Sequence, residues 1–416
     1  MKAIICGAGI GGLTTALHLH RAGIEAEVFE SVAEIRPLGV GINLLPHAVR
    51  ELTLLGLQER LAEIAIPTAE LAYFSKFGKP IWSEPRGLAA GYRWPQFSIH
   101  RGRLQMLLFD EVSRRLGPER VHVGHHLNSF ESGDDAVTAQ FSDRQTGASK
   151  GSATGDVLIA AEGIHSTVRR YFYPDEGAPP FSGRYLFRGV TEAAPFLTGK
   201  SMIMAGYPDR KFVAYPICPE TAARGASLVN WIADVRMPGE QAPPVRDWNR
   251  RVDASVFGSL FEPWKFDWLD IPALIRGANE IFEYPLVDRD PLPRWSFGRV
   301  TLLGDAAHPM YPIGSNGASQ AILDAAAIAA ALTAQANVPE ALRVYESVRL
   351  EPTSKIVLAN RQQGPEACMQ LVEERAPHGF GRLEDVISRA ELEEIAARYK
   401  AVAGFDRDLL NAMATV

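Results

Sequence analysis

The stretch that decides the fold is KAIICGAGIGGLTTALHLHRAGIEAEVFE, residues 2–30. Its first part, Lys2 to Cys6, is an apolar, β-rich run that is typical of a buried parallel strand. A glycine turn with the spacing G-x-G-x-x-G follows, then apolar residues at helical spacing, and then a second strand from Glu25 to Phe29. Glu30 closes that strand. Strand, turn, helix, strand and carboxylate together predict a dinucleotide-binding unit.

Each glycine of the turn has its own physical role, and the three are Gly7, Gly9 and Gly12. The first permits the tight turn, the second lets the backbone approach a pyrophosphate, and the third lets the helix pack close to the strand. The helix N-terminus offers free N–H groups to the phosphates, and Glu30 is placed to accept from ribose hydroxyls. A glycine turn in an ordinary α/β protein explains neither Gly12 nor Glu30. The fingerprint alone does not separate NAD from FAD.

The composition is that of an ordinary globular chain with a mildly acidic balance. Its 416 residues suffice for two or three domains, and 46% of them are hydrophobic. A net charge of −6 argues against a nucleic-acid partner. The three cysteines lie far apart, so neither a disulfide framework nor a metal site is expected. Because the N-terminus leads directly into the first strand and no apolar run reaches the length of a span, we expect no membrane partner and a cytoplasmic location.

Three further segments bring candidate groups toward the same nucleotide. A buried strand from Val157 to Ala160 is followed by Glu162 and Gly163, where open α/β sheets hold ligands. Gly41 lies in a loop that either returns beside the phosphate turn or lies free on the surface. Arg101 opens a helix, and its side chain either points back at a phosphate or the flavin edge or is simply solvated.

A second decisive stretch reads VTLLGDAAHPMYPIGSNGASQAILDA, residues 300–325. A buried strand ends before Asp305, which is thereby placed at the carboxyl edge of the sheet, in reach of a ribitol or ribose hydroxyl. A glycine-rich loop from Pro309 to Gly317 leads into a long apolar helix that begins at Ala318. If a flavin lies in this loop, the helix N-terminus stabilises the anionic reduced ring. A plain strand-to-helix loop accounts poorly for Gly-Asp, His-Pro and Asn-Gly together.

Residues 174–293 differ in character, because aromatic residues and prolines become frequent there. The alternating segments Ser201 to Met204, Phe212 to Ile217 and Ser227 to Ile232 predict strands of a second sheet. Such a sheet is suited to covering a flat apolar ligand. For any single tryptophan, an ordinary aromatic core remains the alternative.

The segments GAGIGG, AEGIHSTVR and GDAAHPMYPIGSNG resemble, in this order, the three FAD motifs of the group A flavoprotein monooxygenases related to para-hydroxybenzoate hydroxylase. The resemblance extends to about residue 360. Within that family, EIRPLGVGINLLP, SIHRG, FRGV and VDRDPLPRW are most similar to the phenazine branch, that of 5-methylphenazine-1-carboxylate 1-monooxygenase. The resemblance implies that FAD is bound by Gly7, Gly9, Gly11, Gly12, Glu30, Gly41, Arg101, Glu162, Gly163, Asp305, Gly314, Gly317 and Ala318. Glu162 departs from the family pattern, which usually has Asp there.

The fold class that follows is α/β. A Rossmann-like FAD-binding domain, with a parallel sheet and flanking helices, is interleaved with a mainly antiparallel β-sheet substrate domain and ends in a C-terminal helical segment. The expected ranges are 1–70, 100–173 and 294–360 for FAD binding, 71–99 and 174–293 for the substrate domain, and 361–416 for the C-terminal helices.

The chemistry is likewise implied by the resemblance. NADH or NADPH binds transiently, since only one dinucleotide fingerprint is present, and reduces the FAD. O₂ then forms a flavin C4a-hydroperoxide that hydroxylates an aromatic substrate, so no side chain acts as a nucleophile. The loop residues expected over the ring are Pro312, Gly314, Asn316 and Gly317. The phenazine branch implies an N-heteroaromatic carboxylate, with loss of CO₂ where the attacked carbon carries the carboxylate.

The substrate pocket is expected to be lined by Arg188, Tyr215, Trp231, Met310 and Pro312. Arg188 either meets a substrate carboxylate or forms a structural ion pair. Two alternatives to the monooxygenase are a flavin-dependent halogenase or epoxidase on the same scaffold and a non-catalytic flavin-binding protein that sequesters a ligand. The sequence leaves a monomer and a homodimer equally open.

Overall fold

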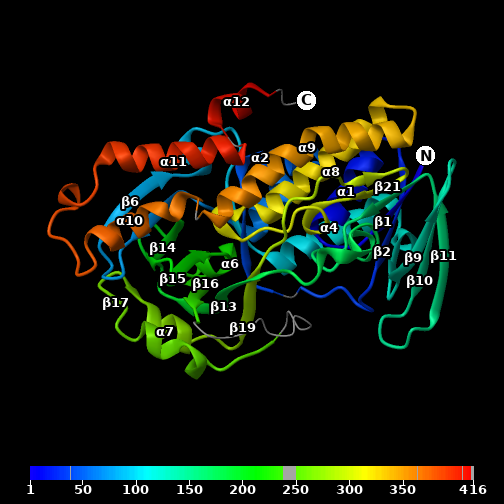
Figure 1. Ribbon diagram of the computed structural model, residues 1–416. Coiled ribbons are helices and arrows are strands. Elements are labelled where there is room, and N and C mark those ends of the chain that lie inside the picture. Colours follow the sequence, from blue (N-terminus) through cyan, green and yellow to red (C-terminus); the bar gives the residue numbers. More distant parts are fainter. Residues whose placement is uncertain (38, 238–249, 363, 405, 414–416) are drawn as a thin grey trace.

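The computed structural model describes residues 1–37, 39–237, 250–362, 364–404 and 406–413. Figure 1 shows a parallel sheet with its helices at one end of an elongated molecule and a mainly antiparallel sheet, in which only β14 and β5 pair in parallel, at the other. The parallel end is a six-stranded sheet with the order β20-β21-β12-β1-β2-β8, in which only β20 runs antiparallel to its neighbour. Its strands are β1 (Lys2–Cys6), β2 (Glu25–Glu30), β8 (Val121–Val123), β12 (Val157–Ala160), β20 (Ser296–Phe297) and β21 (Val300–Leu302). The predicted parallel α/β architecture is confirmed.

Helices and a small sheet cover this parallel sheet, because its central strands are apolar on both faces. Ile4 and Ile5 of β1 are fully buried. Helix α1 packs on α4 and α8, and α8 packs on α2 and α9. The helices are α1 (Ile10–Arg21), α2 (Pro46–Leu54), α3 (Gln58–Ile64), α4 (Arg101–Leu116), α5 (Thr167–Phe172), α8 (Gly317–Ala334) and α9 (Val338–Arg361). A three-stranded sheet of β9 (His126–Ser132), β10 (Val137–Ser142) and β11 (Ser149–Gly155) packs on the parallel sheet through Phe141, whose ring centroid lies 4.2 Å from that of Phe29.

The other end of the molecule is a seven-stranded sheet with the order β19-β13-β16-β15-β14-β5-β6. Its strands are β5 (Glu70–Phe74), β6 (Pro80–Pro85), β13 (Phe181–Ala193), β14 (Ser201–Tyr207), β15 (Arg210–Pro216), β16 (Ser227–Arg236) and β19 (Ile281–Val287). The strands predicted here include β14, β15 and β16, whereas the long strand β13 and the strand β19 were not predicted. One face of the sheet packs on an aromatic core that includes Phe257 and Phe261 together with α7 (Ile271–Arg276).

The opposite face of the seven-stranded sheet is shared between the FAD-binding end and the C-terminal helices. Cys368, Met369 and Val372 of α10 pack with Met202 and Met204 of β14. The C-terminal helices are α10 (Ala367–Arg375), α11 (Arg389–Ala403) and α12 (Arg407–Ala412). A connecting sheet of β3 (Gly41–Leu44), β7 (Phe97–His100) and β4 (Ala65–Pro67) joins the two ends, and the remaining short elements are α6 (Pro219–Ala223), β17 (Lys265–Phe266) and β18 (Leu269–Asp270). The predicted domain boundaries stay a prediction.

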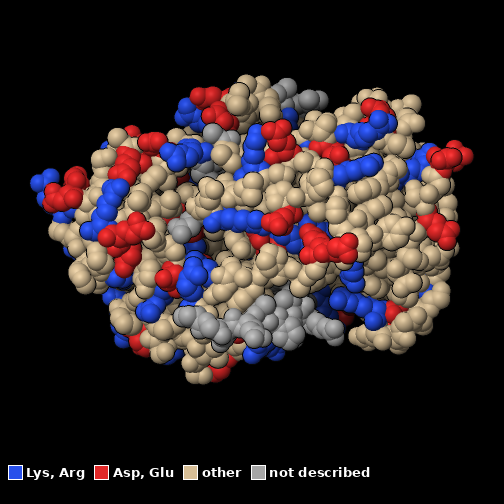
Figure 2. Space-filling model, viewed as in Figure 1, with Lys and Arg blue, Asp and Glu red and all other residues tan. Residues whose placement is uncertain are grey.

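One expectation about apolar runs is wrong. The segment Ile313–Ala334, which includes α8, is long and apolar enough to cross a bilayer by length and composition. A single helix of this kind is weak evidence for a membrane span. The sequence reading missed it because small residues dominate the stretch. In the fold this helix packs on α1, α2 and α9, and its Asp324 is fully buried. On the face seen in Figure 2, acidic and basic side chains are interspersed. All three cysteines lie in the described chain as buried free thiols.

Candidate active site

The phosphate turn has the backbone geometry that its glycines allow. Gly7 has φ +110°, and a Cβ there would lie 2.3 Å from the carbonyl oxygen of Ala161. A Cβ on Gly12 would lie 1.9 Å from the carbonyl oxygen of Gly7. A Cβ on Gly9, by contrast, would meet no atom of the described residues within 4 Å. The fold therefore requires the first and third glycines for packing, while Gly9 faces open space of the kind that a pyrophosphate would fill.

Glu30 lies at this turn, as predicted. Its Oε2 accepts a hydrogen bond from the Ala8 N–H at 2.8 Å, and its Oε1 accepts from the Val32 N–H at 2.9 Å. Gln105 of α4 donates from Nε2 to the Ala8 carbonyl at 2.8 Å. The carboxylate and α4 thus hold the turn from two sides. A contact between Glu30 and a bound ribose stays a prediction.

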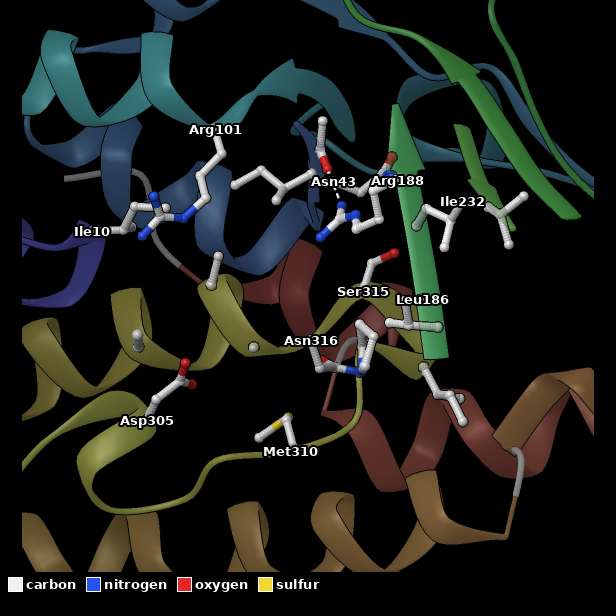
Figure 3. A pocket seen from close by; sticks show the side chains of 18 of the residues that line it. Ile10, Asn43, Arg101, Leu186, Arg188, Ile232, Asp305, Met310, Ser315 and Asn316 are labelled. Carbon is white, nitrogen blue, oxygen red and sulfur yellow. Dashed lines mark hydrogen bonds between the residues drawn. The ribbon is translucent and has the colours of Figure 1, made fainter. Parts of the chain in front are cut away.

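A cavity of about 360 Å³ opens in front of the turn and extends to the seven-stranded sheet. Figure 3 shows Arg101 and Arg188 pointing into it, with Asp305 and Met310 on the loop that borders it. Most of the residues predicted for the site line this one space. They are Gly9, Gly11, Gly41, Arg101, Gly163, Arg188, Tyr215, Asp305, Met310, Pro312, Asn316, Gly317 and Ala318. The three sequence motifs therefore converge, as the nucleotide interpretation requires.

Arg101 and Asp305 supply opposite charges at the FAD end of this cavity. Both side chains are exposed to the cavity space. The surrounding protein nevertheless removes most of the bulk water around them. This desolvation lowers the pKa of Arg101 and raises the pKa of Asp305. Each group partly offsets the other's shift by electrostatic attraction. Neither side chain would keep its full hydration with a ligand present, so both are suited to contact polar groups of a cofactor.

The loop before α8 turns its backbone toward the cavity. Gly314 has φ +67° and Ser315 has φ +60°, a conformation that costs a residue with a Cβ about 1 kcal/mol. Ser315 lines the cavity, whereas Gly314 lines a small neighbouring pocket. Helix α8 then begins at Gly317 with 18 residues, so its N-terminal N–H groups and the positive end of its dipole border the cavity. This arrangement fits an anionic ring edge.

A buried charged network beneath Asp305 holds this loop, and the sequence reading missed its centre, Asp324. The Gly304 N–H donates to Asp324 Oδ2 at 3.0 Å, and His308 Nε2 lies 2.6 Å from the same oxygen. Arg349 Nε donates to Oδ1 at 2.7 Å. Burial alone would raise the pKa of Asp324, but His308 and Arg349 lower it to about 2. The sequence signal that could have identified Asp324 is that it is the one charged residue in the apolar helix α8.

Besides Gly314 and the residues of the phosphate turn, two predicted site residues do not line the cavity, and the first is Glu162. Its carboxylate accepts from Ser166 Oγ at 2.7 Å and from the N–H groups of Thr167 and Val168 at 3.3 Å. Burial raises its pKa, and these hydrogen bonds oppose the shift. The carboxylate therefore caps α5, while the neighbouring Gly163 lines the cavity. A contact between Glu162 and the cofactor stays a prediction, and the bonds to α5 give its carboxylate a second role.

The second of these residues is Trp231, and its burial excludes it from the cavity. Its side chain is fully buried and stacks near Phe212 at 5.9 Å between ring centroids. Its indole N–H donates to Thr191 Oγ1 at 3.0 Å. Trp231 therefore belongs to the aromatic core on the face away from the cavity. The adjacent Ile232 lines the cavity instead, since neighbouring residues of a strand point to opposite faces.

The substrate end of the cavity is apolar apart from a few polar groups. Arg188 Nη2 donates to the Gly41 carbonyl at 2.7 Å, and the Tyr215 hydroxyl donates to the same oxygen at 2.8 Å. Burial raises the pKa of Tyr215 to about 12, so its hydroxyl keeps its proton. Within the described residues no carboxylate lies at ion-pair distance from Arg188. Apolar lining residues that strand alternation would have found are Leu186, Met202, Met204, Val213 and Ile232.

Comparisons with known proteins agree with this geometry. The family model described as "FAD binding domain" matches residues 1–184 and 287–359. The chain is 44% identical to the phenazine 1,6-dicarboxylic acid hydroxylase PhzS of Lysobacter antibioticus over 96% of each chain. It is 32% identical to the 3-amino-4-hydroxybenzoate 2-monooxygenase of Streptomyces cremeus, over 86% of this chain and 85% of that one.

A solved structure gives the same result. The crystal structure of Klebsiella pneumoniae HpxO, complexed with FAD and uric acid, superposes with a TM-score of 0.72 at 25% identity, over 99% of this chain and 95% of that one. The cavity, the glycine turn and the α8 N-terminus fit FAD. These matches favour a hydroxylase over a halogenase or a sequestering protein. The chain therefore belongs to the FAD-binding family of aromatic hydroxylases and monooxygenases, and it is an FAD-dependent enzyme of that family.

Proposed function

We propose that this enzyme hydroxylates a phenazine-type aromatic carboxylate, using O₂ and reducing equivalents from NADH or NADPH, and that Arg188 binds the substrate carboxylate. The observation that supports the proposal most strongly is the position of the Arg188 guanidinium in the cavity. Arg188 is half-buried in a mostly apolar cavity, and no carboxylate of the described chain lies at ion-pair distance from its guanidinium. A half-buried guanidinium without an acidic partner is a strong site for a planar carboxylate. The identity to the phenazine dicarboxylic acid hydroxylase supports the choice of ring system.

The chain's own residues would position the ring and exclude water. Leu186, Val213 and Ile232 form an apolar wall from three neighbouring strands, β13, β15 and β16. Tyr215 and Arg188 share the Gly41 carbonyl, which fixes both polar groups relative to the connecting sheet. Bound FAD supplies the activation of O₂ and the oxygen-atom transfer to the ring. A dry cavity favours that transfer over loss of the oxidant to water.

The experiment is turnover of a panel of aromatic acids by the purified yellow enzyme. NADH or NADPH oxidation is followed with phenazine-1-carboxylic, quinoline carboxylic and hydroxybenzoic acids, and products are identified by mass after reaction in ¹⁸O₂. We expect the phenazine acid to stimulate oxidation most and to gain one ¹⁸O atom, with loss of CO₂ where the attacked carbon carries the carboxylate. Stimulation by a hydroxybenzoate alone, or conversion of all O₂ to H₂O₂, would overturn the proposal.

A further inference from the structure

Four charged side chains, three of them buried, pair with one another at the substrate end of the cavity. Lys211 of β15 forms an ion pair with Glu366, and its Nζ lies 3.3 Å from Asp234 Oδ2. Asp234 of β16 also pairs with Arg184 of β13 at 2.7 Å. Lys211, Asp234 and Glu366 are each at most 5% exposed. Two cations therefore balance two carboxylates, and this group, called the charge quartet below, is neutral.

The charge quartet lies in the wall of the cavity. Lys211, Asp234 and Glu366 line the 360 Å³ space, and the same three residues line a second cavity of about 270 Å³ behind it. Arg184 lines the second cavity only. The quartet is thus a partition between the two spaces.

The register of the sheet gives the distance from Arg188. Arg188 lies opposite Ile232 on β16, and Asp234, two residues further along, lies opposite Lys211 on β15. Two strand spacings and two residues of rise place the Cα atoms of Arg188 and Lys211 roughly 12 Å apart. A linear three-ring aromatic acid whose carboxylate is held by Arg188 would therefore direct its far edge toward the charge quartet.

We infer that the charge quartet determines specificity: it admits an uncharged ring edge and discriminates against a second carboxylate, so that the substrate is an aromatic monocarboxylate. The inference rests on the proposed function. Lys211 is the cation at this end, and two carboxylates already occupy it. A second substrate carboxylate would lose its hydration without gaining an unpaired cation, and it would face Asp234 and Glu366.

The C-terminal region contributes one carboxylate of the charge quartet to the cavity wall. Glu366 lies directly before α10, and α10 packs on β14 through Met369 and Cys368. The carboxylate that neutralises Lys211 therefore comes from a segment to which the sequence reading assigned only helices. Changing Glu366 alters the cavity's charge without altering either the FAD turn or Arg188.

The test compares phenazine-1-carboxylic acid with phenazine-1,6-dicarboxylic acid on four proteins: the wild type, Glu366→Gln, Lys211→Met and the double variant. We expect the wild type to prefer the monoacid at least tenfold in kcat/KM. Glu366→Gln leaves one positive charge and should reduce that preference about tenfold, whereas Lys211→Met leaves one negative charge and should increase it. The double variant is neutral again and should return to within about threefold of the wild type.

The matched control is Glu373→Gln. It removes an ion pair of α10 itself, Lys76–Glu373 at 2.6 Å, whose residues line neither cavity in the described chain. Its preference should equal that of the wild type, while flavin content and unfolding temperature report folding of every variant. A preference that does not change with the charge at 211 and 366, or a wild type that prefers the diacid, overturns the inference alone. A wild type that binds and oxidises neither acid removes the proposed function and the inference with it.

Discussion

Arg188→Met is the most informative single change, because it removes the charge and retains most of the side chain's length. Arg188 is half-buried and lies 5.8 Å from the Tyr284 ring centroid. A charge-assisted pair between its guanidinium and a substrate carboxylate is expected to contribute about 2–3 kcal/mol. At about 1.4 kcal/mol per factor of ten, kcat/KM for the acid should fall roughly 30- to 150-fold.

The substitution also removes the hydrogen bond from Arg188 to the Gly41 carbonyl, so the assay must separate the two effects. Phenazine-1-carboxamide serves as the matched substrate, because it has the same shape without the charge. The loss at Gly41 affects acid and amide equally, whereas the loss of charge affects only the acid. We expect the acid-to-amide ratio of kcat/KM to fall by at least about tenfold. Equal losses on both substrates would refute the assignment and leave Arg188 as a residue that positions the connecting sheet.

Three other predictions concern the cofactor turn, acid stability and the corrected core residue. Gly12→Ala places a Cβ 1.9 Å from the Gly7 carbonyl, so the turn must shift and the purified protein should lose its flavin absorbance. Burial lowers the pKa of His18 to about 4, so below its ordinary pKa the unfolded chain takes up a proton that the folded chain excludes. His18 should therefore contribute a fall of about 3 kcal/mol in the free energy of unfolding from about pH 7 to pH 4 in urea titrations, and His18→Gln should remove that contribution. Trp231→Phe loses the bond to Thr191 and should cost about 2 kcal/mol of stability with KM unchanged; a raised KM would return Trp231 to the substrate site.

The part of the site that the sequence predicted consists of turns attached to strand ends. The turn after β1 and the polar residues after β21 depend on local chain geometry, which the glycines and the Gly-Asp pair specify directly. Because β1, β12 and β21 are adjacent and parallel, their carboxyl ends meet at one edge of the sheet. Local patterns and one topological rule were therefore sufficient to bring Gly9, Gly163 and Asp305 to one cavity.

The part that the sequence did not predict depends on strand register. Tyr215 and Trp231 lie on the adjacent strands β15 and β16, and both are aromatic residues in alternating segments. The register pairs Trp231 with Ala214, so Trp231 shares a face with Ala214 and not with Tyr215. If the pairing of β15 and β16 shifted by one residue, Trp231 would share a face with Tyr215. The local sequence of the two strands does not determine which of these registers forms. Long-range pairing alone separates a cavity residue from a core residue here.

Glu162 shows a second reason why the sequence does not determine a residue's role: one side chain has two suitable partners. From its position after β12 the carboxylate is placed either for a ligand or for the start of α5, whose N-cap Ser166 lies four residues later. The helix provides three donors, the Ser166 hydroxyl and the N–H groups of Thr167 and Val168. A Glu reaches one methylene further than the family's usual Asp, and these bonds satisfy a carboxylate that burial would otherwise destabilise.

One face of the seven-stranded sheet lines the cavity, and the other face packs on the aromatic core. Because the two roles lie on opposite faces, the cavity can contain charged residues without weakening the core. Along β15, Lys211, Val213 and Tyr215 face the cavity, while Phe212 and Ala214 face the aromatic core. Burying Lys211 is costly unless it is paired, and its partners come from β16 and from the C-terminal segment. Substitutions at cavity-facing positions should therefore change the preferred substrate more than the stability, provided that the buried charges stay balanced. Substitutions one residue away along the same strand should do the reverse, because they remove aromatic packing and leave the cavity intact.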